Sequence, residues 1–83
     1  MHRATRRFWE CFANLPDEIQ NVARKNYALL QANPHHPSLQ FKKVGKVWSA
    51  RVGLHYRALA TEDGVDFIWV WIGTHDEYER MIQ

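Results

Sequence analysis

The spacing of apolar residues changes at the segment NPHHP, residues 33–37, and this change constrains the fold more than any other feature. Before the segment, apolar side chains recur every three to four residues, which is the period of an α-helix. After it, through LQFKKV, VWSARV and HYRALATE, they alternate with polar ones, as in a β-strand. Because Pro34 and Pro37 cannot continue a helix, the sequence predicts an α+β chain with two helices first and a sheet after them.

The predicted helical region, residues 5–33, divides at Pro16 into two helices. The first carries one apolar face, formed by Phe8, Trp9, Cys11, Phe12 and Leu15. Pro16 suits the first turn of the second helix, and Asp17 and Glu18 follow where the positive end of the helix dipole favours carboxylates. We therefore expect a helical hairpin.

The predicted sheet consists of short strands separated by turn residues, at Gly45, at Gly53 and at residues 62–64. Such spacing favours antiparallel hairpins. The run FIWVWI, residues 67–72, is apolar on both faces, so we expect it in the centre of the sheet. With a short helix over residues 75–82, the fold class is α+β: an N-terminal helical hairpin packed on one face of a small antiparallel β-sheet, followed by a short C-terminal helix.

The size and composition predict a single domain over residues 1–83. Cys11 is the one cysteine, so no intramolecular disulfide is possible and a reducing compartment is favoured. No run approaches the roughly 20 apolar residues of a membrane helix, so we expect a cytoplasmic protein without a membrane partner. His35 and His36 are adjacent and would not face one metal ion, so neither a metal site nor another cofactor is predicted.

The net charge of +2 conceals an uneven distribution along the chain. Residues 1–57 carry ten Lys and Arg against three acidic residues, a net +7, whereas residues 58–83 carry one Arg against six acidic residues, a net −5. A basic surface of this kind suggests a polyanionic partner.

The stretch WIGTHDEYER, residues 71–80, gathers a histidine, a tyrosine and several carboxylates behind the most apolar run. Thr74 and Glu77 have the spacing of a capping box, which explains Glu77 without a catalytic role. Asp76 suits the first helical turn, and Glu79 is expected to be solvated. Neither capping nor packing requires His75, so this residue is the candidate general acid or base.

Two arginines occur inside apolar strands, Arg51 in VWSARV and Arg57 in HYRALATE. Each lies out of phase with its apolar neighbours, so both are expected on one face of the sheet, where guanidinium groups can grip phosphate. The alternative is that they pair with Asp66 or Glu62 on neighbouring strands. The pattern alone leaves both interpretations open.

Lys42, Lys43 and Lys46 flank a predicted hairpin and are candidate RNA-binding residues, with Trp48 or Trp71 as a stacking surface. Basic residues on an edge strand also deter sheet aggregation, which is the alternative explanation.

The ordered set NPHHPSLQFKKVG, VWSARVGLHYRALA and VWIGTHDEYERM resembles the RelE/ParE superfamily of toxins from bacterial type II toxin–antitoxin systems. The resemblance implies that Arg57 stabilises the scissile phosphate and that Arg51 occupies a basic position on the preceding strand. It places His75 where some members have a catalytic histidine, and Tyr78 at a late tyrosine. Ser49 departs from the pattern, because one branch has a catalytic lysine there.

The resemblance also implies a cognate antitoxin and a target. Ribonuclease members cleave mRNA in the ribosomal A site without a metal, whereas the ParE branch inhibits DNA gyrase. A ribosome-dependent mRNA endonuclease, in which the ribose 2′-OH attacks the adjacent phosphate, is the leading hypothesis. A non-enzymatic gyrase inhibitor and an inactive solitary relative are the alternatives.

Overall fold

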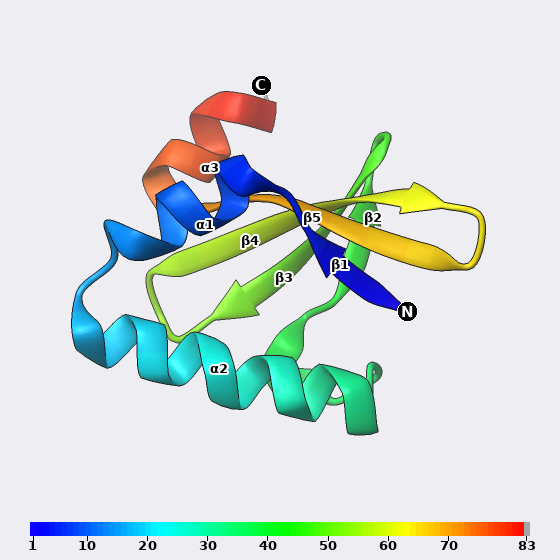
Figure 1. Cartoon of the computed structure of the whole chain (residues 1–83), viewed down its shortest axis with the longest axis horizontal. Helices are drawn as coiled ribbons and strands as arrows, with labels where there is room; N and C mark the ends of the chain where they lie inside the picture. Colours follow the sequence, from blue (N-terminus) through cyan, green and yellow to red (C-terminus); the bar gives the residue numbers. More distant parts are fainter. Residues whose placement is uncertain (83) are drawn as a thin grey trace.

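The computed structural model describes residues 1–82, which form three α-helices and a five-stranded sheet (Figure 1). In chain order the elements are β1 (His2–Ala4), α1 (Arg6–Ala13), α2 (Asp17–Ala32), the 3-10 turn η1 (Pro37–Leu39), β2 (Lys42–Val44), β3 (Val47–Val52), β4 (Tyr56–Asp63), β5 (Asp66–Thr74) and α3 (His75–Ile82). The α+β fold class predicted from the period change is confirmed.

The two N-terminal helices form the expected hairpin. The side chain of Thr5 caps α1 by accepting a hydrogen bond from the backbone N–H of Phe8 at 3.2 Å. Pro16 precedes α2, and two carboxylates occupy its first turn. Trp9 differs from the expectation, because its side chain is 55% exposed and its ring packs against the edges of neighbouring aromatic rings on α1.

The sheet has the order β1-β5-β4-β3-β2. Strands β2 to β5 form the predicted series of antiparallel hairpins, whereas β1 pairs with β5 in parallel, with His2 opposite Phe67. We expected residues 67–72 in the centre of the sheet, and the strand order corrects this expectation. β5 is an interior strand between β1 and β4, and β4 is the middle strand.

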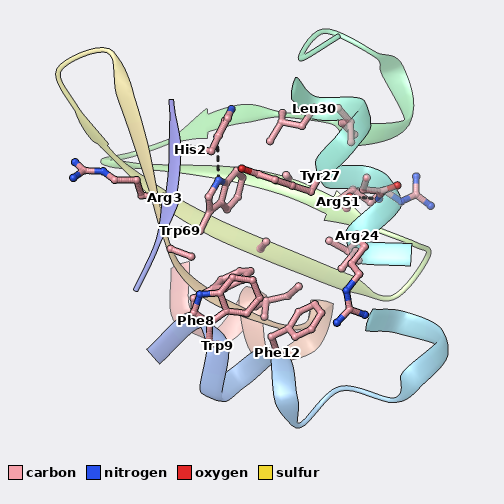
Figure 2. Close-up of a pocket in the computed structure, with 18 residues that line it drawn as sticks. His2, Arg3, Phe8, Trp9, Phe12, Arg24, Tyr27, Leu30, Arg51 and Trp69 are labelled. Carbon is pink, nitrogen blue, oxygen red and sulfur yellow. Dashed lines mark hydrogen bonds between the residues drawn. The ribbon is translucent and has the colours of Figure 1, made fainter. Parts of the chain in front are cut away.

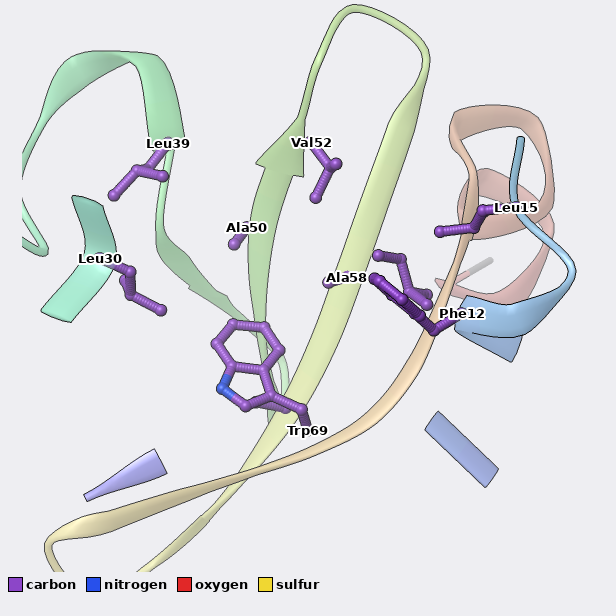
Figure 3. Packing of buried hydrophobic residues seen from close by; sticks show 10 residues of the cluster. Phe12, Leu15, Leu30, Leu39, Ala50, Val52, Ala58 and Trp69 are labelled. Carbon is purple, nitrogen blue, oxygen red and sulfur yellow. The ribbon is translucent and has the colours of Figure 1, made fainter. Parts of the chain in front are cut away.

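The main hydrophobic core lies on the face of the sheet that α1 and α2 cover (Figure 3). Trp69 of β5 projects into it between the helices and the small residues Ala50 and Ala58, which form part of the sheet floor. Leu39 of η1 is only 1% exposed and fixes this turn to the core. Small floor residues leave room for the helices to approach the sheet.

A second, smaller core lies on the opposite face, where Leu59, Trp71 and Tyr78 pack together beneath α3. The indole of Trp71 lies over Gly73, so close that a Cβ added at Gly73 would be 2.4 Å from its Cζ2 atom. The absence of a side chain at Gly73 therefore allows Trp71 to support α3.

No helix within residues 1–82 is long and apolar enough to cross a membrane.

Candidate functional site

A cavity of about 210 Å³ opens beside the start of α3. It is lined by Gln40, Arg51, Leu54, Tyr56, Arg57 and His75. The structure thus brings together three of the four predicted catalytic side chains, two arginines and a histidine, from β3, β4 and α3.

Arg57 lies at the buried end of this cavity, with 7% of its surface exposed. Its Nη1 donates to Ser49 Oγ at 3.1 Å and its Nη2 donates to Gln40 Oε1 at 2.7 Å, while its buried Nε has no partner. The guanidinium carbon lies 5.4 Å from the centre of the Tyr78 ring. The hydrogen-bond acceptors and the ring that contact this guanidinium are therefore all neutral, which favours binding of an anion.

The alternative pairing of the arginines with strand carboxylates is wrong. Asp66 instead pairs with the N-terminal ammonium at 3.1 Å and with Arg3, and Glu62 pairs with Lys43 at 3.2 Å. Neither Arg51 nor Arg57 forms an ion pair within residues 1–82. Both positive charges remain available to a ligand.

Arg51 lies directly opposite Arg57 in the pairing of β3 with β4, so the two side chains leave the sheet on one face, as predicted. Its Nε donates to the carbonyl oxygen of Gly53 at 2.8 Å. This bond holds the Arg51 side chain against the end of β3, where it lines the cavity.

His75 is the first residue of α3 and is half exposed, with 43% of its side chain accessible. Its backbone N–H donates to the carbonyl oxygen of His55 at 2.7 Å, which ties the helix start to the turn between β3 and β4. Its Nε2 lies 2.9 Å from Glu79 Oε1, one helical turn later. Glu79 is exposed, as expected, and its carboxylate contacts His75 from that exposed face, so Nδ1 is the ring nitrogen left for a substrate.

The predicted capping box at the start of α3 is confirmed. The Glu77 backbone N–H donates to Thr74 Oγ1 at 3.2 Å, and Glu77 Oε1 accepts from the Thr74 backbone N–H at 3.1 Å and from its hydroxyl at 2.9 Å. The hydrogen bonds that the Glu77 carboxylate accepts lower its pKa, and the one from the Thr74 backbone N–H has the largest effect. The cap fixes the direction in which the adjacent His75 leaves the sheet.

Tyr78 is 4% exposed and lies beneath the other two site residues. Its ring centre is 5.7 Å from that of His75, and the guanidinium of Arg57 lies over the same tyrosine ring. A buried tyrosine in this position holds a cation and an imidazole at a fixed separation.

The sequence model of the ParE-like toxin domain matches residues 17–80, which contain every residue of the cavity. The chain belongs to the ParE-like toxin family. The resemblance to the RelE/ParE superfamily is thereby confirmed. No curated protein matches the sequence.

Solved structures with the same fold come from several toxins. A chain of the RelB–RelE antitoxin–toxin complex from Methanococcus jannaschii is 15% identical, with a TM-score of 0.75 over 98% of this chain and 99% of that one. YafQ from E. coli strain BL21(DE3) is 12% identical, with a TM-score of 0.71 over 94% and 96% of the two chains. The YoeB/ParE toxin from Agrobacterium tumefaciens is 11% identical, with a TM-score of 0.66 over 89% and 96%.

The three predicted RNA-binding lysines of this ParE-like protein lie outside the cavity. Lys42 is exposed on the edge strand β2 opposite Ser49, so it shares a sheet face with Arg57. Lys43 projects to the other face and pairs with Glu62, and Lys46 lies exposed in the β2–β3 turn.

The predicted stacking surface is not formed by Trp71, which is 7% exposed beneath α3. Trp48 is half buried against Phe41, with ring centres 4.8 Å apart, and its indole N–H donates to Glu62. Both tryptophans thus contribute to packing.

Sequence reasoning missed Gln40 as a site residue and treated Ser49 only as a departure from the pattern. Both hold the guanidinium of Arg57. The side-chain phase of β3 placed Ser49 on the face of Arg57, so its role was accessible from the period of the strand. Gln40 lies in a connection that has no such period.

A larger cavity, of about 290 Å³, lies on the other face, between α1, α2 and the sheet (Figure 2). Its lining is mostly apolar, with Trp9, Tyr27 and Trp69 among the aromatic residues, and Arg51 reaches both cavities. At its edge the Trp69 indole N–H donates to Nδ1 of His2 at 3.1 Å. Burial lowers the pKa of His2, the nearby N-terminal ammonium lowers it further, and Asp66 opposes the shift.

Within residues 1–82, no three His, Cys, Asp or Glu side chains are grouped so that they could hold a metal ion.

Proposed function

We propose that this ParE-like protein is the toxin of a type II toxin–antitoxin system and cleaves mRNA on the ribosome in the cytoplasm. The observation that carries the proposal is the buried guanidinium of Arg57, which lacks a carboxylate partner in a cavity shared with Arg51 and His75. A phosphodiester supplies the missing negative charge, and a histidine beside it supplies the proton transfer that RNA cleavage requires.

In the proposed reaction, the ribose 2′-oxygen forms a bond to the adjacent phosphorus and the bond from phosphorus to the 5′-oxygen breaks. His75 accepts the proton of the 2′-OH, and the departing 5′-oxygen takes a proton from water. The products are a 2′,3′-cyclic phosphate and a 5′-hydroxyl end. Arg57, assisted by Arg51, stabilises the negative charge that develops on the phosphoryl oxygens, an effect worth about 10²–10³ in rate when one donor is removed.

The contact between His75 and Glu79 supports the role of a base. A carboxylate accepts a hydrogen bond from Nε2–H of a neutral imidazole and so leaves the lone pair on Nδ1. Tyr78, held beneath both catalytic groups, orients the substrate site by fixing Arg57 and His75.

Lys42, Lys43 and Lys46 hold the RNA backbone outside the cavity. Lys42 is best placed, because it lies on the face of Arg57, whereas Lys43 exchanges Glu62 for a phosphate when RNA binds. Contacts of this kind release counterions, so RNA affinity falls as the salt concentration rises.

Mapping mRNA 5′ ends in a translating extract tests this proposal. Wild-type protein is expected to produce new 5′ ends, while Arg57→Ala and His75→Ala reduce their yield about 10²-fold or more. Arg7→Ala, which changes an exposed arginine of α1, is the matched control and is expected to retain cleavage. Absence of new ends with wild-type protein, or equal cleavage by the two site variants, would remove the proposal.

The second candidate is a non-enzymatic inhibitor of DNA gyrase. It is supported by the match to the ParE-like model and by Ser49, which stands where one ribonuclease branch has a lysine. Accumulation of cleaved DNA in a supercoiling assay would favour this function, and unaffected gyrase would exclude it.

Harmless expression without any antitoxin would indicate the third alternative, an inactive solitary relative.

An antitoxin is the proposed protein partner. Similar folds occur in RelB–RelE antitoxin–toxin complexes from Methanococcus jannaschii and E. coli. The exposed aromatic side chains Trp9 and Tyr27, beside the apolar cavity of about 290 Å³, are the kind of surface that a protein partner covers. Co-expression with the protein encoded by the neighbouring gene tests this partner: a stable complex and restored growth are expected, and continued toxicity with no complex would exclude it.

A further inference from the structure

Gln40 has a backbone conformation that its residue type disfavours. Its φ of 44° and ψ of 42° place it in the left-handed region, and it is the one non-glycine residue with positive φ among residues 1–82. A side chain with a Cβ is strained there, and such strain persists where surrounding contacts fix the backbone. The residues on either side of Gln40 make contacts that fix the backbone in this way.

The residues on both sides of Gln40 are fastened to the core. Leu39 is buried at 1% exposure, and the ring of Phe41 packs on Trp48. Before them, His36 Nδ1 accepts a hydrogen bond from the backbone N–H of Ser38 at 3.2 Å. These contacts hold the main chain in a turn that presents the side chain of Gln40 to the cavity.

The hydrogen bond from Arg57 determines the orientation of the Gln40 amide. A guanidinium only donates, so the amide atom 2.7 Å from Nη2 is the oxygen. The amide nitrogen is then left to donate, and it forms no hydrogen bond within residues 1–82. Ser49 Oγ holds Nη1 of the same guanidinium.

We propose that Gln40 is a positioning residue, which fixes the guanidinium of Arg57 for a phosphodiester without neutralising it. This inference rests on the proposed function, because it concerns the same cavity. A glutamate at this position would hold the guanidinium more firmly but would cancel the charge that attracts phosphate. A neutral amide fixes the direction of the Arg57 donors and leaves the charge of the guanidinium to the ligand.

Two substitutions separate positioning from charge. Gln40→Met removes the acceptor at similar length, so rotation of the Arg57 guanidinium about its Nε–Cζ bond should become faster. Gln40→Glu provides a charged acceptor, so the rotation should become slower. Both variants should bind a 2′-deoxy dinucleotide, which 2′-OH attack cannot cleave, about tenfold or more weakly than wild type.

Arginine side-chain NMR measures the rotation, and NMR titration with the 2′-deoxy dinucleotide measures the affinity. Gln31→Met and Gln31→Glu are the matched controls, because Gln31 is an exposed glutamine of α2 whose amide bonds to Tyr27. They should leave both quantities unchanged. A purely structural role of Gln40 would change the rotation rate of the Arg57 guanidinium in the same direction in both variants, which would contradict the inference.

The outcomes also distinguish this inference from the proposed function. If wild-type protein cleaves mRNA and Gln40→Met retains full dinucleotide affinity, the inference is wrong and the proposed function stands. If wild-type protein does not cleave mRNA but both variants show the expected changes, the proposed ribonuclease is wrong and the positioning role stands. Absence of dinucleotide binding by wild-type protein would overturn the inference.

Discussion

Arg51 and Arg57 are directly paired residues on neighbouring strands, and neither forms an ion pair within the part of the chain that the structure describes. Like charges opposite each other on a sheet oppose folding. The fold tolerates this pair because Ser49, Gln40 and the carbonyl oxygen of Gly53 accept hydrogen bonds from the two guanidinium groups. A bound anion would relieve the repulsion that these neutral groups leave in place.

Phosphate should therefore stabilise the protein more than chloride at equal ionic strength. At a phosphate concentration 100 times its Kd, the free energy of unfolding should rise by about 2.7 kcal/mol. Thermal unfolding measures this as a higher Tm. The gain should disappear in Arg57→Gln and persist in Arg7→Gln, which alters an exposed arginine that does not line the cavity. An equal gain in both variants would contradict a site at Arg57.

Gly73→Ala should destabilise the fold, because the added Cβ would lie 2.4 Å from Cζ2 of Trp71. The indole is buried, so relief requires a shift of Trp71 and of the helix above it. We expect a loss of about 1–3 kcal/mol in the free energy of unfolding, measured by urea denaturation. Trp71→Leu should make room, so the double variant should lose less than the sum of the two single variants. Strict additivity would refute the proposed clash.

Thr74→Ala should reduce the free energy of unfolding by about 1 kcal/mol, because it removes the acceptor of the capping box. Glu77→Gln addresses the charge. Because hydrogen bonds from Thr74 lower the pKa of Glu77, its stabilising effect is present above the unfolded-state pKa of about 4.3 and is lost as pH falls through the folded-state pKa. Unfolding of wild type and Glu77→Gln should therefore differ at pH 6 and converge in strong acid. A difference that stays constant with pH would show that the ionised Glu77 carboxylate is not the source of this stabilisation.

Lowering the pH from 7.5 to 5.5 should destabilise the wild-type protein partly through His2. The folded state lowers the pKa of His2, chiefly by burial, so it binds fewer protons than the unfolded chain just below the unfolded-state pKa of about 6.5. Protonation also removes the acceptor of the Trp69 indole N–H. Denaturant unfolding at both pH values should show that the free energy of unfolding falls less between pH 7.5 and pH 5.5 for His2→Phe than for wild type. His35→Phe, at an exposed position, should behave as wild type.

Features governed by local periods were predictable from the sequence. The alternation within each strand placed both arginines on one face, and the spacing of Thr74 and Glu77 predicted the cap. The pairing of His75 with Glu79 was also accessible, because residues four apart lie on the same helical face. Glu79 lies on the exposed face expected for it, but its contact with His75 on that face was missed.

Contacts between distant segments were not predictable in this way. The hydrogen bond from Arg57 to Gln40 joins a strand to a turn 17 residues earlier, and the conformation of that turn depends on how Leu39 packs. The parallel pairing of β1 with β5 likewise depends on the arrangement of the whole sheet, since the three residues of β1 carry too little pattern to identify their partner.

The parallel pairing of the first strand with the last one sets an order of events during synthesis. Thr5, the residue that follows β1, donates a backbone hydrogen bond to the carbonyl oxygen of Trp69, and the two residues are 64 positions apart. The N-terminal segment therefore leaves the ribosome long before its partner exists, and α1 has no β5 to pack against until then. Contacts over such sequence separations form slowly. A protein proposed to attack translation would thus acquire its cavity only after β5 and His75 of α3 have been synthesised.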